Sequence, residues 1–271
     1  MAILCTLVIL LAGVGVYFVI INRNKMIICD THIWYGIGNG TITEIPSNVK
    51  LVATFNNIDE FSRTRNLVKY PEYTMKGIQA MFKYSRKHVI YEPPLVYLKK
   101  LSDKDFKYNI LEKHNNILRF TEKIAKGYGI DLSKTDEYSQ FCDDRKKELQ
   151  YISDIFNQQA AQLKAKIKDL KTHRKENSIP LNRELISLFV EKANHTGGLP
   201  RDFDWKSIEL FENVLKVYFN GLETGEILSA ANDWYDLFLL IYVQPGKKIW
   251  TREKKWLKLI KQSGMESYLW A

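Results

Sequence analysis

The sequence predicts an α/β protein in which helices flank a parallel sheet, with a large helical insertion and an N-terminal transmembrane helix. Short apolar strands alternate with helices at both ends of the 271-residue chain, a pattern typical of parallel sheets. The middle of the chain is predominantly helical, and the first 21 residues carry no charged side chain. We expect a transmembrane helix at residues 1–22, one α/β domain split between 26–102 and 229–271, and the insertion at 103–228.

Charge and cysteine content limit the classes of partner and compartment. The formal net charge of +9 favours a polyanionic partner, either nucleic acid or an anionic membrane surface, although a solvated lysine-rich surface explains it equally well. Cys5, Cys29 and Cys142 form no CxxC or Cys/His cluster. Neither a zinc site nor a disulfide framework is therefore indicated, and a reducing compartment fits.

The N-terminal segment has the length and composition of a membrane span. About 20 helical residues cross the hydrocarbon core, and residues 1–21 are uncharged and mostly apolar. Arg23 and Lys25 follow this run, which by the positive-inside tendency places the rest of the chain in the cytoplasm. We expect a single-pass cell-membrane protein with a four-residue tether at 22–25. The alternatives to a membrane span are a buried core helix and an N-terminal extension ahead of a domain that starts at Met26.

The first part of the α/β domain is expected to contain three strands and a helix. Residues 26–29 form a short apolar strand that ends at Asp30, and 36–40 form a glycine-rich loop, interpreted as a flexible flap beside Asp30. Residues 50–55 form a second strand, and Asn57 can cap the following helix. Residues 89–91 form a third short strand before a Pro-Pro pair.

A highly charged helix is expected within the insertion, at residues 138–175. Only one of the three intermediate positions between its seven-residue repeats is apolar, whereas a coiled coil needs apolar residues at both positions of its seam. This favours one amphipathic helix docked on a neighbour over a dimerising coiled coil. We expect the helix to end at residues 178–180. The residues that recur every seven positions are Leu149, Phe156, Leu163 and Leu170.

The last part of the chain returns to strand and helix alternation. Residues 232–243 form an apolar helix, a turn at Pro245-Gly246 leads into a strand at 247–250, and a basic amphipathic helix spans 254–261.

Acidic residues stand where strands end or helices begin. The carboxyl ends of parallel strands meet at one edge of a sheet, so these side chains can converge there. Converging carboxylates repel one another and persist together when a cation neutralises them, and oxygen ligands favour Mg²⁺ or Mn²⁺ over zinc. Taken one at a time, each acidic residue has a simpler explanation: its side chain could stabilise the first turn of a helix or face solvent. The residues are Asp30, Glu60, Asp233, Asp236 and Glu253.

Two blocks of the chain resemble PIN-domain nucleases. Residues 27–34, IICDTHIW, resemble the opening of that family, where a short apolar strand runs into Asp-Thr or Asp-Ser. Residues 50–61 resemble its second strand and the helix with the second acidic residue, here Glu60. In the late block an Asp opens an apolar helix, here Asp236, and a strand then ends in Thr-x-acid, here Thr251 and Glu253. Glu253 stands where the family usually has Asp or Asn.

The resemblance covers about residues 26–65 and 229–269 and implies a Mg²⁺- or Mn²⁺-dependent endoribonuclease, toxin-like or defensive in role. It implies catalytic residues Asp30, Glu60 and Asp236, with Asp233 and Glu253 as additional metal ligands and Thr251 in support. His32 is expected to be packed or hydrogen-bonded. Basic residues near the site are expected to contact nucleic acid, with a solvated helix face as the alternative: Lys247, Lys248, Arg252, Lys254 and Lys255.

Two other functions stay open from the sequence. One is a catalytically inactive, PIN-like, membrane-anchored interaction protein whose partner or inhibitor binds the helical insertion. The other is a nuclease that acts on DNA. A homodimer is a further candidate assembly for each.

Overall fold

The computed structural model describes residues 25–108, 112–128, 135–167, 174–194 and 197–270. The expected transmembrane helix at residues 1–22 lies outside these ranges. Among the described residues, no helix combines the length and the apolar character that crossing a membrane requires.

Four parallel strands form the sheet, as predicted. They are β1 (Met26–Cys29), β2 (Lys50–Thr54), β3 (Val89–Ile90) and β4 (Lys248–Trp250), in the order β3-β2-β1-β4. In the register, Ile27 of β1 lies opposite Leu51 of β2 and Lys248 of β4. The chain adds β2 and β3 on one side of β1 and returns much later to add β4 on the other. The carboxyl ends of β1 and β4 are therefore the point where the direction of winding changes, the usual place for a ligand site in such sheets.

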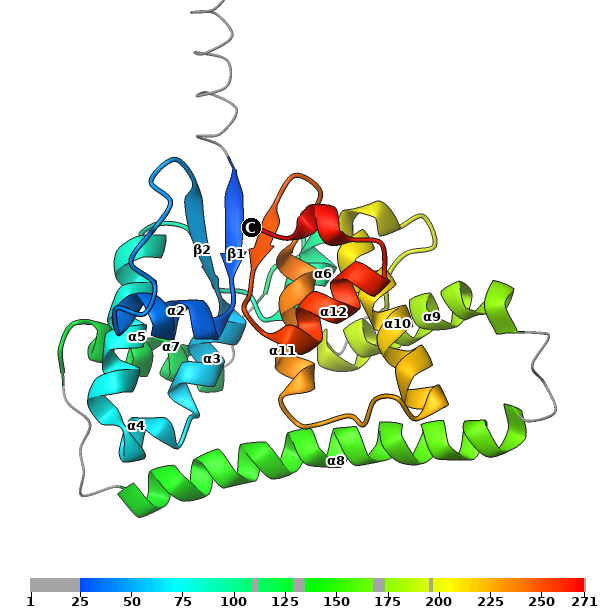
Figure 1. Cartoon of the computed structure of the whole chain (residues 1–271), viewed down its shortest axis with the longest axis horizontal. Coiled ribbons are helices and arrows are strands. Elements are labelled where there is room, and N and C mark those ends of the chain that lie inside the picture. Colours follow the sequence, from blue (N-terminus) through cyan, green and yellow to red (C-terminus); the bar gives the residue numbers. More distant parts are fainter. Residues whose placement is uncertain (1–24, 109–111, 129–134, 168–173, 195–196, 271) are drawn as a thin grey trace, which may run out of the picture.

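One face of the sheet is covered by helices from the first half of the chain (Figure 1). Alternate strand residues, Ile27 and Cys29 of β1 and Leu51 of β2, pack there with Trp34 and Phe61 in one buried cluster. The helices that supply this layer are α2 (Thr31–Gly38), α3 (Phe55–Ser62), α4 (Asn66–Lys69), α5 (Pro71–Ser85) and α7 (Glu112–Ala125).

The expected flexible loop at residues 36–40 is wrong, because most of it belongs to α2. Its glycines allow close helix packing: a Cβ on Gly38 would lie 2.3 Å from the backbone oxygen of Lys76 in α5. Only Gly40, with a φ of +75°, adopts the left-handed conformation of a turn. The segment beside Asp30 is thus an ordered helix.

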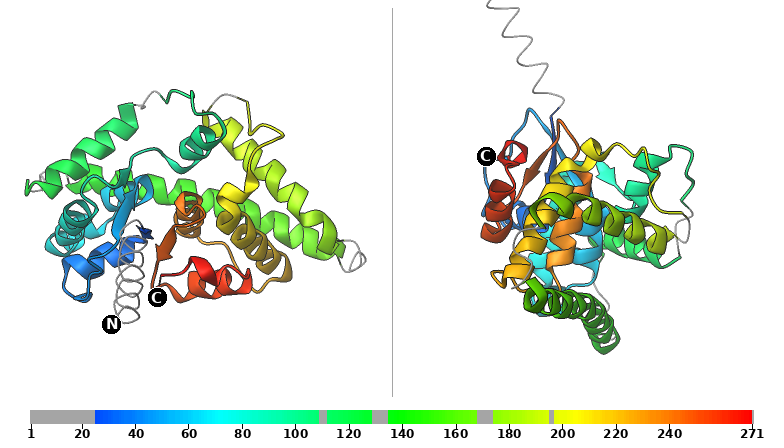
Figure 2. Two further views of the ribbon diagram at one scale, coloured as in Figure 1. Left: turned by 90° about the horizontal axis from the view of Figure 1, so that it is seen from above. Right: turned by 90° about the vertical axis from the view of Figure 1, so that its right-hand side faces the viewer.

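The other face carries a second buried cluster that contains Ile28, Val52 and Ile249 of the sheet together with Tyr218 and Trp234. Figure 2 shows helices on both sides of the strands. The helices of this second layer are α6 (Pro94–Ser102), α9 (Arg174–Asn194), α10 (Glu209–Thr224), α11 (Asp233–Leu239) and α12 (Lys254–Gln262). The helix break predicted at residues 178–180 is also wrong, since α9 runs through them.

The long charged helix α8 (Thr135–Ile167) runs along one end of the molecule beneath both groups of helices (Figures 1 and 2). Leu149 is buried in the second cluster, and the ring of Phe156 lies 4.7 Å from that of Trp234. This agrees with an amphipathic helix docked on its own chain. The side chains of Leu163 and Leu170 lie outside the described part.

Candidate metal centre

Asp30 occupies the carboxyl end of the central strand. Its backbone N–H donates to the carbonyl oxygen of Trp250 at 3.0 Å, which extends the pairing of β1 with β4 by one residue. Asp30 is also the residue before the first turn of α2, and only 3% of it is exposed. The end of β1 therefore holds a buried carboxylate at the point where the winding changes.

The end of β4 fixes this carboxylate. The Thr251 hydroxyl donates to Oδ2 of Asp30 at 2.7 Å and accepts from the backbone N–H of Glu253 at 3.1 Å. Thr251 is buried and so can orient Asp30 while it turns the chain toward Glu253. In the Thr-x-acid pattern, the threonine therefore binds Asp30 and also stabilises the turn that leads to Glu253.

Glu60 is held to the same edge through two residues that the sequence did not single out for the site. The Thr31 hydroxyl donates to Oε2 of Glu60 at 2.5 Å and accepts from Nδ2 of Asn57 at 3.1 Å. Asn57 also accepts from the backbone N–H of Thr54 at 2.8 Å, in a capping box that starts α3 at Phe55. Asn57 thus lies inside the helix that it was expected to cap, where it links α3 to the end of β1.

Asp236 reaches the site from α11. Its Oδ2 accepts a hydrogen bond from the indole N–H of Trp256, in α12, at 2.7 Å, and Trp256 is itself buried. Two helices distant from β1 in the chain therefore position the third carboxylate.

The carboxylates of this site act on one another electrostatically. Burial, and then the charges of Asp30, Glu253 and Glu60, raise the pKa of Asp236 well above its usual value. Burial also raises the pKa of Asp30, against the hydrogen bond from Thr251, and raises that of Glu60 to about 7. Acids whose pKa values are raised both by burial and by one another's charges are a sign of missing positive charge.

His32 stands at the exposed margin of the cluster, with 60% of its side chain accessible. Its Nδ1 lies 2.7 Å from Oε1 of Glu253, and this hydrogen bond, aided by the charge of Asp30, raises the pKa of His32 to about 9 although burial opposes it. Asp30, His32 and Glu253 each offer a ligand atom, and these atoms lie within 4.8 Å of one another. His32 is thus hydrogen-bonded, as expected, and it adds an imidazole to a site that we expected to consist of oxygens.

The donor set fits a divalent cation. Carboxylate oxygens are the ligands that Mg²⁺ and Mn²⁺ prefer, and a bound cation would offset both the burial and the repulsion that raise the pKa values of Asp30, Glu60 and Asp236. Among the described residues, the group whose ligand atoms all lie within 4.8 Å of one another is Asp30, His32 and Glu253. Glu60 and Asp236 are not in this group, although the charge of Asp30 acts on both.

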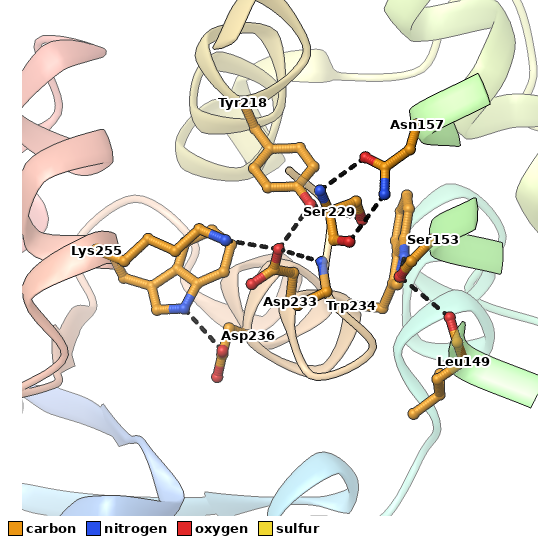
Figure 3. Close-up of polar contacts among 11 residues, drawn as sticks. Leu149, Ser153, Asn157, Tyr218, Ser229, Asp233, Trp234, Asp236 and Lys255 are labelled. Carbon is orange, nitrogen blue, oxygen red and sulfur yellow. Dashed lines mark hydrogen bonds and ion pairs between the residues drawn. The ribbon is translucent and has the colours of Figure 1, made fainter. Parts of the chain in front are cut away.

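Asp233, the fifth predicted ligand, has a different environment (Figure 3). Its Oδ2 accepts from the Tyr218 hydroxyl at 2.8 Å and from the backbone N–H of Ala230 at 2.9 Å, and it pairs with Nζ of Lys255 at 2.6 Å. These partners hold the start of α11 against α10 and α12. The structure therefore gives Asp233 a supporting role in the second cluster and does not bring it among the other acids.

The basic residues predicted to contact nucleic acid separate into two groups. Lys255 is engaged by Asp233, and Lys247 donates to Gln244 Oε1 at 2.8 Å. Lys248 donates to the backbone oxygen of Ser267. Arg252 and Lys254, on either side of Glu253, are exposed. Only these last two combine exposure with a place beside the acids.

Comparison with known proteins gives no match to this chain among family models, curated proteins or solved structures.

Proposed function

We propose that this protein is a membrane-anchored, Mg²⁺- or Mn²⁺-dependent phosphodiesterase of the PIN-like kind that cleaves RNA internally. The observation that carries the proposal is that Asp30, His32 and Glu253, at the carboxyl edge between β1 and β4, offer ligand atoms within 4.8 Å of one another, with Glu60 and Asp236 near enough for the charge of Asp30 to act on them. The acids come from four segments of the chain, and burial and their mutual charge raise the pKa values of Asp30, Glu60 and Asp236.

The side chains of the site have distinct roles in such a reaction. Ionised Asp30, Glu60 and Asp236 would hold the cation, while Thr251 and Thr31 orient two of them through hydrogen bonds at 2.7 and 2.5 Å. The cation, when bound, supplies a water of lowered pKa and positive charge near the leaving oxygen. Water would attack phosphorus in line, the bond to the 3′-oxygen would break, and that oxygen would leave protonated.

The choice of a polyanionic substrate follows from charge. The chain has a formal net charge of +9, and the exposed Arg252 and Lys254 flank Glu253, where they could contact phosphates. The choice of RNA over DNA comes from the family resemblance.

The decisive experiment is cleavage of fluorescent single-stranded RNA and of DNA of the same sequence by the full chain in nanodiscs. We expect Mn²⁺-dependent cleavage of RNA, abolished by EDTA and reduced at least ~100-fold by Asp30→Asn, with the melting temperature retained. Asp144→Asn, on the exposed surface of α8, is the matched control and should stay active.

Each other outcome has a defined meaning. Activity that survives Asp30→Asn would overturn the assignment of the site. Cleavage of DNA alone would replace RNA as the substrate. No cleavage, together with no thermal stabilisation by Mn²⁺, would favour the inactive interaction protein.

A further inference from the structure

The two ends of the sheet carry opposite charge. All four strands are parallel, so their first residues lie at one edge, the amino edge, and their last residues lie at the other. Acidic residues follow the carboxyl ends of three strands: Asp30 comes directly after β1, Glu92 follows β3 and Glu253 follows β4. The amino edge is therefore the end of the sheet that lies away from the acidic site.

Basic residues stand at the start of every strand. The short segments that lead into the strands, at residues 24–26, 48–50, 86–89 and 246–248, contain six lysines and arginines and no aspartate or glutamate. The six residues are Lys25, Lys50, Arg86, Lys87, Lys247 and Lys248.

The strand register brings these cations close together. The backbone N–H of Lys50 donates to the carbonyl oxygen of Lys25 at 2.9 Å, and Ile27, two residues after Lys25, lies opposite Lys248. Neighbouring strands are about 4.8 Å apart. Three of the cations thus begin adjacent strands at nearly the same level.

The turn before β3 adds its charges on the outer side of β2. The backbone N–H of Ala53 donates to the carbonyl oxygen of His88 at 3.1 Å. Burial lowers the pKa of His88, and the positive charges of Lys50 and Lys87 lower it further. Cations of β2 and of this turn therefore act on the same imidazole.

Among the described residues, no acid neutralises the amino edge. Lys25, Lys50, Arg86 and Lys87 take part in no ion pair there. Lys247 and Lys248 donate to neutral oxygens, those of the Gln244 side chain and of the Ser267 backbone. Arg86 and Lys87 are exposed, and the other four are partly exposed. The edge thus presents positive charge to whatever lies against it.

The sequence before β1 indicates a bilayer at this edge. Residues 1–21 are uncharged and mostly apolar, and only residues 22–25 separate them from the first residue of β1. A run of that length is expected to span a membrane, which would place the amino edge among the headgroups. Anionic lipids of the cytoplasmic leaflet attract basic residues close to the surface. Nucleic acid would also be attracted, but the acids that would cleave it lie at the other edge.

We propose that the amino edge binds the anionic headgroups of the membrane that anchors the chain. The proposal rests on the membrane attachment included in the proposed function and is independent of cleavage. It gives Lys247 and Lys248 a lipid partner in place of the nucleic acid expected from the sequence, and it turns the acidic site away from the bilayer.

The test measures hydrogen exchange of the full chain in nanodiscs of phosphatidylcholine, with or without about 30% phosphatidylserine. We expect exchange at residues 47–50, 86–89 and 246–248 to be at least ~3-fold slower with phosphatidylserine, because each cation near an anionic surface favours contact by about fivefold. Raising the NaCl concentration from about 0.15 M to about 1 M should remove most of the difference, since charges are then screened within about 3 Å.

Charge-reversal variants connect the effect to the amino edge. The double variant Lys50→Glu with Lys87→Glu should lose the slowing by phosphatidylserine. The matched control is Lys146→Glu with Lys147→Glu, two exposed lysines of α8 at the opposite end of the molecule (Figure 1), which should keep it. Lys87→Gln, a single change in an exposed turn, should reduce the slowing with the melting temperature retained, and it serves if the double variant does not fold.

The outcomes separate this proposal from the others. Exchange that does not respond to phosphatidylserine, or an equal loss in the α8 control, would overturn it. Slowing by single-stranded RNA and not by phosphatidylserine would assign the edge to nucleic acid instead. A chain that does not enter nanodiscs would refute the membrane attachment together with this proposal. Slowing by phosphatidylserine in a chain that does not cleave RNA would support this proposal and count against the nuclease alone.

Discussion

Asp233 and Asp236 lie one turn apart on α11 but have different neighbours. One oxygen of Asp233 satisfies a buried hydroxyl, a backbone N–H and an ammonium group. Asp236 accepts from the indole N–H of Trp256, and the charges of Asp30, Glu253 and Glu60 raise its pKa together with burial. Substitution of each residue should therefore affect a different property of the protein.

We expect Asp233→Ala to lower the free energy of unfolding by about 2–3 kcal/mol, because three donors lose their acceptor. Asp236→Asn should leave stability nearly unchanged and abolish Mn²⁺-dependent cleavage. Chemical denaturation and RNA cleavage assays on both variants measure the contrast. A stable Asp233→Ala variant without activity would place Asp233 in the metal centre instead.

Glu60 makes stability depend on pH. Its pKa rises from 4.5 to about 7 on folding, mainly through burial, so the native state prefers the protonated form. The stabilisation is complete below about pH 4.5 and is lost as pH rises through about 7, a change of roughly 3 kcal/mol.

We expect the protein in EDTA to lose stability between about pH 5 and 7 and the Glu60→Gln variant to lose less. Saturating Mn²⁺ should remove most of the loss, because the cation favours ionised Glu60. Melting temperatures across this pH range, with and without Mn²⁺, provide the measurement. A loss of the same size in Glu60→Gln would assign it to another group.

At the scale of elements, α8 holds the segment that leads into α11 and α11 itself. Asn157 accepts from the backbone N–H of Ser229 at 2.8 Å and donates to its carbonyl oxygen at 3.0 Å, and the Trp234 indole donates to Ser153 at 3.2 Å. Figure 3 shows that these contacts continue toward Asp233 through the start of α11. The helix is thus part of the frame that positions α11.

Phe156→Ala should cost about 2–4 kcal/mol, because the ring packs on Trp234 at 4.7 Å and on Phe219 at 5.4 Å. Tyr151→Ala, on the same helix with 68% of the tyrosine exposed, should stay within about 0.5 kcal/mol of the parent. Urea denaturation of both variants tests this. Equal costs would mean that α8 does not dock through this face.

The spacing of apolar residues predicted most helices and strands. The predictions failed where a glycine or a proline was interpreted as a break although it lies within a helix. Gly36 and Gly38 suggested a loop, yet they allow α2 to approach Ile42 and α5 closely. A proline suggested a helix break at residues 178–180, although α9 continues through it. A single sequence does not show whether a small residue marks a turn or a close contact, because the partner backbone is far away in the chain.

At the scale of the whole molecule, the expected membrane span and the acidic site are joined by a single strand. β1 starts at Met26 and ends next to Asp30, so the carboxylates lie about 13 Å from its start. Cleavage would therefore take place near the inner membrane surface.

We expect the full chain to sediment with membranes and to resist extraction by alkaline carbonate, whereas a chain without residues 1–22 should be released. Protease added to inverted membrane vesicles should digest the domain, because Arg23 and Lys25 favour a cytoplasmic location. Release of the full chain by carbonate would contradict the span, and protection of the domain would reverse its orientation.

The sequence by itself determined the alternation of strands and helices, the parallel sheet, and acids at strand ends and helix starts, because periodicity and chain direction are local properties. The tertiary structure decided which acids meet. It separated Asp233 from Asp236, placed His32 against Glu253 and made Asn57 a link between α3 and β1. It also formed a cavity lined by residues of α3, α6, α7, α8, α9 and α11. These features depend on which way side chains from distant segments point toward one another, and only the packing of those segments determines this.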